Sequence, residues 1–318
     1  ENLEELNARN LSKYPVLLGG AALNRRYVEE DLQPLYNGNV FYCKDAFEGL
    51  TILENLDDYK NQPRKKQALK EKTQGEKPSS GTSNVQKNAV IPEPPFWGSR
   101  VVRGLSLREI YKYINQVALF RGQWQYQKGE QTDSEYQKML TKTVEPVFRK
   151  LQDDAITEKL LQPEVVYGYF PCKADGNKLN VWKNIGKSGP EGEPVQFNFP
   201  RQTDGRGLCI SDFFKDASSK EYDTVAFHIV TVGKKASEVA GNLFKQNQYK
   251  DYLHLHGFGV ETAEALAEFW HKRIREELGI ANNDAQAIRD LFAQGYQGSR
   301  YSFGYPACPD LEQQVLIA

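Results

Sequence analysis

The residues best suited to chemistry lie in one stretch near the end of the chain, residues 300–310, with the sequence RYSFGYPACPD. Pro306 and Pro309 lack backbone donors and fix φ, and Gly304 permits a bend, so a rigid, extended loop is predicted. Its exposed carbonyl groups and Arg300 could hold a polar ligand, while the aromatic rings of the stretch cover an apolar or planar part. The alternative is a proline-rich connection that packs over a core.

A second candidate group lies on a helix predicted over residues 260–278. Its apolar stripe is expected to contain Val260, Ala263, Ala267, Trp270, His271 and Ile274. Glu264 falls at the edge of this stripe, where a half-buried carboxylate requires a partner. That partner is either an Arg or Lys side chain or the charged end of a ligand. His271 is predicted to pack in the core, and His254 and His256 indicate a metal pair only weakly, because no acidic or thiol partner lies at ligand spacing.

A third group lies at the ends of two short apolar segments near the start of the chain. Residues 14–23 and 38–43 are each predicted to contain a strand, with helices between and after them. This alternation indicates a parallel α/β sheet, in which ligands bind at the carboxyl ends of the strands. Gly19, Gly20 and Ala46 fall at these ends, where small side chains let a large, flat ligand approach. The alternative is an ordinary turn between a strand and a helix.

Length and composition limit the class of protein. A chain of 318 residues allows about two domains. The formal net charge of −1 creates no global field that attracts nucleic acid or an anionic membrane, and no apolar run approaches the ~18 residues of a membrane span. The four cysteines form no CxxC pair, which argues against a disulfide scaffold and a structural zinc site. We therefore expect a cytoplasmic protein, without nucleic-acid or membrane partners.

The composition divides the chain into three parts. Residues 1–57 carry the α/β pattern, and residues 58–94 form a lysine-rich, polar stretch that is predicted to be a flexible linker. A nucleic-acid-binding arm is the alternative for this stretch, and the lack of an aromatic platform disfavours it. Residues 95–318 combine helices with alternating strands, predicted at 165–172, 179–182, 195–202, 207–214 and 224–233. This pattern predicts an α+β domain with a mainly antiparallel sheet and flanking helices.

The sequence of residues 300–310 resembles the S-adenosylmethionine-binding signature of the activation domain of cobalamin-dependent methionine synthase. The segments VLLGGA at 16–21 and VFYCKDA at 40–46 resemble the last two strand ends of the B12-binding domain of the same family. The resemblance implies that residues 1–57 are the end of a Rossmann-like cobalamin-binding domain. It implies an S-adenosylmethionine-binding activation domain, truncated at its C-terminus, over residues 95–318. The chain also lacks an initiator Met, and a fragment of a longer protein is expected.

The resemblance implies a set of ligand-binding residues. For S-adenosylmethionine they are Arg300, Gly304, Tyr305, Ala307, Glu264 and Asn115. For the nucleotide tail of cobalamin they are Gly19, Gly20 and Ala46. Asn115 stands where the family has an acidic residue that reaches the ligand's amino group; because an amide brings no charge, a lower affinity is expected. The family's loop with the cobalt-ligating histidine does not occur here, so this half-domain is not expected to bind cobalamin well unaided.

By the same resemblance, the chain is part of a methyltransferase that uses methylcobalamin to methylate homocysteine in methionine biosynthesis. Its own task is to present S-adenosylmethionine for the reductive methylation of oxidised cobalamin, with an electron from a flavodoxin-like or equivalent reductase. The expected partners are this reductase and the other synthase domains, of which the homocysteine domain carries the family's zinc. No metal site and no catalytic side chain are expected in this chain, because its residues position the ligand. The alternative is a non-catalytic module that binds S-adenosylmethionine or cobalamin.

Overall fold

The computed structural model describes residues 2–19, 23, 25–43, 48–49, 52–53, 85, 90–187, 189–202 and 207–317. The chain divides into two compact units, residues 1–81 and 82–318, and the boundary falls inside the stretch 58–94 that the composition predicts as a linker. Each unit has a hydrophobic core of its own. Within the described ranges, no helix has both the length and the apolar character needed to cross a bilayer.

The N-terminal unit contains two parallel strands joined by a helical connection. Strands β1 (Val16–Gly19) and β2 (Val40–Cys43) pair in parallel, with Gly19 opposite Cys43. Other elements whose bounds the structure describes in this unit are α1 (Asn2–Ala8), α2 (Arg25–Tyr27), the π-helical turn η1 (Val28–Leu32) and the 3-10 turn η2 (Gln33–Leu35). The core of this unit is formed by Leu3, Val28, Tyr36 and Val40. The predicted order of strand, helix and strand is present, and the start of the next predicted helix, at residue 46, lies outside the described residues.

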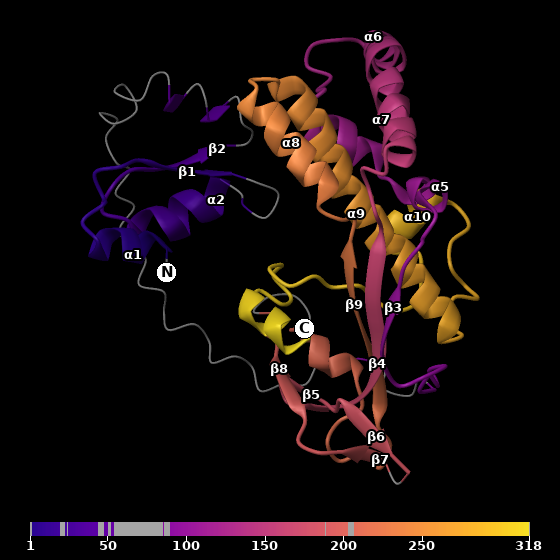
Figure 1. Cartoon of the computed structure of the whole chain (residues 1–318). Coiled ribbons are helices and arrows are strands. Elements are labelled where there is room, and N and C mark those ends of the chain that lie inside the picture. The colour runs from indigo at the N-terminus through magenta and orange to yellow at the C-terminus, as the bar shows by residue number, and fades with distance from the viewer. Residues whose placement is uncertain are drawn as a thin grey trace. The chain divides into compact units, whose positions relative to one another are not determined.

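The C-terminal unit is built on an antiparallel sheet whose long central strand pairs along both edges (Figure 1). The five strands are β3 (Gly98–Val102), β4 (Glu164–Asp175), β5 (Lys178–Val181), β8 (Val195–Asn198) and β9 (Asp223–Thr231). Strand β9 pairs with one edge of β4, while β3 and then β5 pair with the other, and β8 extends the sheet beyond β5. A separate short hairpin contains β6 (Asn184–Gly186) and β7 (Gly189–Glu191). The prediction of a mainly antiparallel sheet is confirmed.

One predicted strand, over residues 207–214, is wrong, because Ile210–Phe213 forms a short 3-10 helix, η6. The cause is local hydrogen bonding: the Asp212 carboxylate accepts from the backbone N–H of Cys209 at 2.9 Å. Arg201 holds the same carboxylate in a buried, bidentate ion pair at 2.6 and 2.8 Å. An acidic side chain fixed in this way stabilises a turn and competes with strand pairing.

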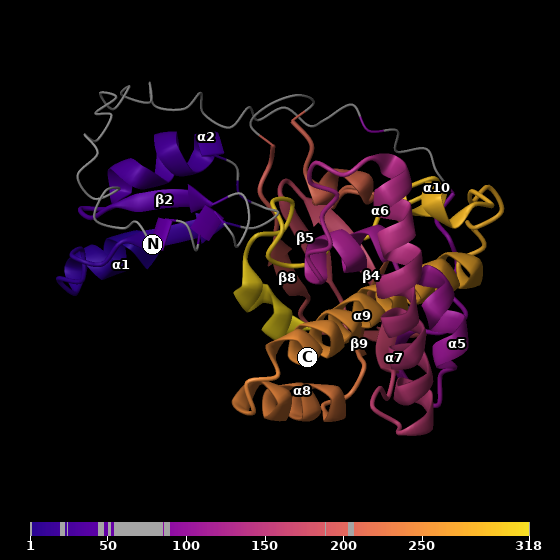
Figure 2. The same ribbon diagram turned by 90° about the horizontal axis from the view of Figure 1, so that it is seen from above.

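Helices flank the sheet (Figure 2). The longest, α9 (Tyr249–Glu277), packs on β9 and lies beside α8 (Lys235–Lys245). On the other side of α9 are α5 (Leu107–Ile110), η3 (Tyr111–Tyr113), η4 (Ala118–Gln123) and the continuous helical run α6 (Asp133–Met139), η5 (Leu140–Val144) and α7 (Glu145–Thr157). The last elements of the chain are α10 (Ile288–Phe292) and η7 (Leu311–Leu316).

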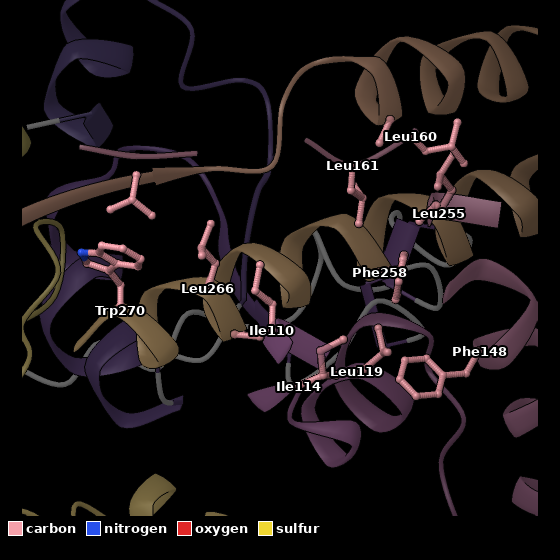
Figure 3. Packing of buried hydrophobic residues seen from close by; sticks show 14 of the residues in the cluster. Ile110, Ile114, Leu119, Phe148, Leu160, Leu161, Leu255, Phe258, Leu266 and Trp270 are labelled. Atoms are coloured by element: carbon pink, nitrogen blue, oxygen red, sulfur yellow. The ribbon is translucent and has the colours of Figure 1, made fainter. Parts of the chain in front are cut away.

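Side chains of α9 enter the core on two sides of the helix (Figure 3). Leu160 and Leu161 approach from one side, and the other side is covered by Ile110, Ile114, Leu119 and Phe148. From α9 itself, the core receives Leu255, Phe258, Leu266 and Trp270. The helix is thus buried between two layers, which explains why so few of its residues are exposed.

The bounds and the buried face of α9 differ from the prediction. The helix begins at Tyr249, so His254 and His256 lie inside it, and Val260 of the predicted apolar stripe is 37% exposed. The early turns contain Gly257, whose low helix propensity hid this part of the helix in the sequence. Packing requires this glycine, because an added Cβ would lie 2.7 Å from the Cβ of Gln123.

Gly168 of β4 provides a test of the sheet register. A Cβ atom at this position would lie 2.2 Å from the Gly98 carbonyl oxygen and 2.8 Å from Ser99 Cα in β3. We expect Gly168→Ala to lower the free energy of unfolding by about 1–3 kcal/mol, because the two backbones must separate. Urea-induced unfolding measures the difference. The control is Gly259→Ala in α9, where no described atom lies within 4 Å of the added Cβ, and where stability should hold or rise by up to about 1 kcal/mol. Unchanged stability of Gly168→Ala would contradict the register.

Candidate functional site

Residues 300–310 fold into a compact turn. The N–H of Gly304 donates to the carbonyl of Cys308, and the N–H of Cys308 donates to the carbonyl of Tyr305, both at 2.9 Å. Gly304 has a φ of +93°, in the region that favours glycine. Pro306 occupies the second position of the turn that starts at Tyr305, and its fixed φ suits that position. The predicted extended loop is therefore wrong, since the prolines and the glycine support a turn instead.

The turn is anchored on both sides. The Cys308 side chain is buried, and the ring of Phe303 packs near Phe197 of β8, with centroids 6.3 Å apart. Downstream, the Gln313 side chain accepts from the Asn198 N–H at 2.9 Å and donates to the Asn198 carbonyl at 3.0 Å. The Gln313 amide thus pairs with both the N–H and the carbonyl group of Asn198, as a neighbouring strand would at the end of β8. The backbone after Arg300 is thus fixed against the sheet.

Arg300, the first residue of this turn-containing loop, lies beside α9. Its Nη2 atom is 3.6 Å from Glu264 Oε2 and 3.5 Å from Glu268 Oε2. These distances permit ion pairing but exceed the roughly 2.7–2.9 Å of a charge-assisted hydrogen bond. No hydrogen bond joins Arg300 to another described residue, and its side chain is 23% exposed. A guanidinium with available donors at the surface can bind a planar carboxylate through two parallel hydrogen bonds.

The two glutamates that face Arg300 differ in burial. The Glu264 side chain is 60% exposed, so it is not the half-buried carboxylate that the helical pattern predicted, and water screens its charge. The Glu268 side chain is 10% exposed. Its Oε1 atom is buried and has no hydrogen-bond partner among the described residues. Sequence reasoning missed Glu268; its spacing of four residues from Glu264, which places both on one face of the helix, was the available signal.

A buried histidine adjoins the Glu268 carboxylate without satisfying it. His271 Nδ1 is 3.9 Å from Glu268 Oε1, too far for a hydrogen bond, and 2.7 Å from Arg275 Nη1. Because arginine only donates, His271 Nδ1 must accept and cannot donate to Glu268. Burial lowers the pKa of His271, and nearby Arg275 and Arg300 lower it further against the opposing effect of Glu268. His271 is therefore a neutral packing residue, as its position in the sequence suggests.

His228 of β9 is a further base at this site, half-buried, and sequence reasoning missed it. Burial, followed by the charge of Arg300, lowers the pKa of His228 to about 4. For Glu268, burial alone would raise the pKa, but the positive charges of Arg300 and Arg275 lower it. The site at neutral pH thus contains an ionised, buried carboxylate next to a neutral imidazole.

Arg275 fixes the chain segment that precedes Arg300. This side chain is fully buried, and its Nη2 atom contacts Asp284 Oδ2 at 2.7 Å. Its guanidinium lies over the Tyr296 ring at 4.0 Å, and His271 meets the same ring edge-to-face at 5.0 Å. A buried guanidinium needs partners of this kind, so the cluster holds Asp284 and Tyr296 against α9 and places Arg300 beside the two glutamates.

Asn115 caps a helical turn next to α9. Its Oδ1 accepts from the backbone N–H groups of Val117 and Ala118, each at 3.1 Å. The preceding η3 contacts α9, where the rings of Tyr113 and Phe269 are 5.4 Å apart. Since an amide oxygen has two lone pairs, both acceptor positions of Asn115 are occupied in this geometry. A ligand ammonium would have to find its acceptor elsewhere.

The residues assigned to cobalamin belong to the N-terminal unit. Gly19 ends β1, and a Cβ at this position would lie 2.6 Å from the Cys43 carbonyl oxygen of β2. Strand pairing by itself therefore requires a glycine here. Gly20 and Ala46 lie outside the described residues.

The arrangement around Arg300 suits one chemical class of ligand. A guanidinium with unused donors stands beside an exposed carboxylate and a buried one with an unsatisfied oxygen. A ligand that carries both a carboxylate and an ammonium would satisfy both kinds of group. The free α-amino-acid end of a larger molecule has this chemistry. Tyr305, 59% exposed on the same turn, offers a ring to the remainder of such a molecule.

Known proteins resemble the chain in sequence and in fold. A family model described as the activation domain of vitamin B12 dependent methionine synthase matches residues 106–318. Methionine synthase of Mycobacterium tuberculosis (strain ATCC 25618 / H37Rv) is 40% identical over 355 residues, which cover 99% of this chain and 30% of that protein. Methionine synthase of Mycobacterium leprae (strain TN) is 38% identical over 363 residues, covering 99% and 29%. The chain thus spans somewhat under a third of the length of these relatives.

Solved structures resemble the fold as well. One of them is described as a crystal structure of the MetH reactivation domain bound to AdoHcy, and it aligns with a TM-score of 0.61 at 23% identity. The alignment covers 73% of this chain and 72% of that one. At this level of identity the likeness concerns the fold, and the chemistry of the site has to be argued from its own residues.

The depressed pKa of His228 predicts a pH-dependent stability. Its pKa is about 4 in the folded protein and 6.5 as a model value. Between these values the unfolded chain binds more protons, so the free energy of unfolding falls as the pH drops from about 6.5 toward 4. We expect His228→Gln to reduce this loss by up to about 3 kcal/mol. Urea unfolding across this pH range measures the slope, and equal slopes for variant and wild type would contradict a neutral His228 imidazole in the folded protein.

The contact between Gln313 and Asn198 predicts a second effect on stability. Gln313→Ala leaves the two Asn198 backbone groups without their partner and should cost about 1–3 kcal/mol of unfolding free energy. It should also speed hydrogen exchange of the Asn198 amide. The matched control is Gln314→Ala, because Gln314 is exposed, and a change within about 0.5 kcal/mol is expected there. If the two variants behave alike, Gln313 does not anchor the loop.

Proposed function

The chain belongs to the family of vitamin B12 dependent methionine synthase activation domains, and from this we propose that it binds S-adenosylmethionine to support reactivation of a cobalamin-dependent methyltransferase. The match to the family covers residues 106–318, which contain α9 and the loop of Arg300. The similar mycobacterial proteins are named methionine synthase. The similar solved structure is described as bound to AdoHcy, which is what S-adenosylmethionine becomes when it gives up its methyl group.

The observation that carries this proposal is the state of the Arg300 guanidinium. It lies at ion-pair distance from two glutamates, and it hydrogen-bonds to neither of them. In the proposal, the ligand's carboxylate takes two of its N–H donors, and Glu264 and Glu268 attract the ligand's ammonium. The unsatisfied Oε1 atom of Glu268 supports the fit of these residues to a ligand with an amino-acid end.

For the loop, we propose that Gly304, Tyr305 and Ala307 form the wall that faces the rest of the ligand. The turn fixes their backbone, and the exposed ring of Tyr305 could cover a planar or apolar part. We assign Asn115 a supporting role, because its oxygen accepts from the backbone N–H groups of Val117 and Ala118.

For the N-terminal unit, we propose the last part of a Rossmann-like cobalamin-binding domain over residues 1–57. Residues 58–94 would be the linker, and residues 95–318 the activation domain. Support comes from the parallel pairing of β1 and β2 through a helical connection, because ligands of such sheets lie at the carboxyl ends of the strands. Gly19, Gly20 and Ala46 would line the channel for the nucleotide tail. Cobalamin, when bound, supplies the cobalt that receives the methyl group.

In this proposal the side chains of the chain position the ligand and do not react with it. Arg300 and the glutamates hold the amino-acid end, so the sulfonium methyl at the centre of the ligand is presented in one orientation. Anchoring of the loop by Gln313 and of the preceding segment by Arg275 limits the motion of Arg300. Rigid support of this kind keeps the geometry of a binding site.

The wider reaction is also a proposal, because the chain spans about 30% of its relatives. It comprises transfer of a methyl group to homocysteine, with the remaining domains of the synthase as partners. A flavodoxin-like or equivalent reductase would supply the electron for reactivation. We place this chemistry in the cytoplasm, in keeping with the reduced cysteines and the ordinary net charge.

Arg300→Ala tests the proposed function. We expect wild-type chain to bind S-adenosylmethionine and S-adenosylhomocysteine in a calorimetric titration, and the variant to bind them at least about 100-fold more weakly, because a two-pronged charge-assisted contact is lost. ATP serves as a nucleotide without an amino-acid end. The matched control is Arg289→Ala in α10, whose side chain is 91% exposed. Equal binding by Arg300→Ala and wild type, or no binding by the wild type, would overturn the assignment.

A further inference from the structure

The most buried carboxylate of the site is Glu268, which neither the sequence pattern nor the resemblance assigns to ligand binding. Its side chain is 10% exposed, against 60% for Glu264 on the same face of α9. Both contact the same Arg300 nitrogen through one oxygen. Charge interactions of an exposed group are screened by water, whereas those of a buried group are screened much less. Burial thus makes Glu268 the stronger acceptor of the pair.

The second oxygen of Glu268 is left without a donor by its own neighbours. Oε1 is buried and has no hydrogen-bond partner among the described residues. His271, 3.9 Å away, cannot donate from Nδ1, because that atom already accepts from Arg275. A buried, ionised oxygen without a donor is unfavourable, and a cationic donor that reaches it is strongly favoured. The oxygen is an acceptor available to a ligand.

The charges around Glu268 indicate that the partner missing from its carboxylate is a cation. Arg275 is committed to Asp284 at 2.7 Å, and burial keeps His271 and His228 neutral at pH 7. Of the groups that the structure describes around this carboxylate, Arg300 supplies the remaining positive charge. When the Arg300 guanidinium turns toward a ligand carboxylate, Glu268 loses its nearest cation. A ligand that brings its own ammonium restores the balance.

We propose that Glu268 is a specificity-determining residue whose buried Oε1 accepts the α-ammonium group of the ligand, so that the zwitterionic end inserts between Arg300 and Glu268. The inference rests on the proposed binding of S-adenosylmethionine. Glu264 contributes a screened attraction at the surface, and Asn115 keeps its oxygen on the backbone of η4. The site therefore selects ligands with an intact amino-acid end, and Glu268 is the main residue that recognises the ammonium group.

A pair of ligands that differ by one group tests this assignment. S-adenosylhomocysteine and its deaminated analogue, S-adenosyl-4-thiobutyrate, share the adenosine, the thioether and the carboxylate, and only the first carries the ammonium. We expect the wild-type chain to prefer the first by about 10- to 100-fold, the range for one charge-assisted hydrogen bond. Glu268→Gln should reduce this preference to less than about 3-fold. The comparison variant Glu264→Gln, which removes the screened charge at the surface, should reduce the preference much less. Affinities come from calorimetric titration, and circular dichroism and thermal unfolding verify the fold of each variant.

The outcomes separate the possible failures. If Glu268→Gln weakens both ligands by the same factor, the residue only positions Arg300, and the inference is overturned. If wild type does not distinguish the two ligands, the inference is also overturned, whether or not the variant folds. If wild type binds neither ligand, the proposed function itself fails and the inference falls with it. Loss of the preference in Glu264→Gln instead of Glu268→Gln would overturn the inference, because the exposed Glu264 would then recognise the ammonium group.

Discussion

Helix α9 is buried between the antiparallel sheet and the helices that precede it, and this double burial constrains the rest of the C-terminal unit. On one side Trp270 meets Tyr167 of the sheet, and on the other Phe258 meets Phe148 of α7. An amphipathic helix at a surface keeps one face in water for its charged residues. In α9 most of that face is covered, so its ionisable side chains must be compensated inside the protein or by a ligand.

The compensation inside the protein is incomplete at one residue. Arg275 is satisfied by Asp284, and His271 accepts from Arg275. Glu268, one turn earlier, has an ion-pair contact to Arg300 through one oxygen and no hydrogen bond from the described residues to the other. Such groups cost stability and are therefore concentrated where a protein binds or reacts. Burial of α9 thus leaves the Glu268 carboxylate incompletely compensated, and the same feature makes the site suitable for a charged ligand.

The C-terminal loop brings the complementary charge to this helix. Its turn is held by Cys308, which is buried in a cluster with Phe197 and Phe199, and by Gln313 at the end of β8. The residues before the turn are held by the cluster around Arg275. Between these anchors Arg300 has little freedom except in its side chain. The ligand-binding residues proposed here thus come from a rigid helix and from a loop that is fixed at both ends, which keeps their separation constant.

The sequence by itself determined the features that depend on residues close to one another along the chain. The alternation of apolar residues indicated the antiparallel strands, and the composition separated the polar, lysine-rich residues 58–94 from the rest of the chain. The motif at 300–310 indicated the family and made Arg300 a candidate ligand-binding residue, because its prolines, glycine and arginine lie within one short stretch. It did not show the geometry: the prolines support a turn and not an extended loop, since φ is fixed by the residue but ψ is chosen by the hydrogen bonds around it.

Only the tertiary structure decided which carboxylate is buried. A helical period places Glu264 and Glu268 on one face, but it does not say how far the neighbouring layers cover that face. The strand predicted at 207–214 is wrong because Arg201 fixes Asp212 where its carboxylate accepts from the backbone of Cys209. The side-chain oxygen of Asn115 accepts from the backbone of its own helical turn. Each of these outcomes depends on which groups meet in space and on how much water they retain. Burial and hydrogen-bond competition are properties of the packed molecule, and a linear pattern does not contain them.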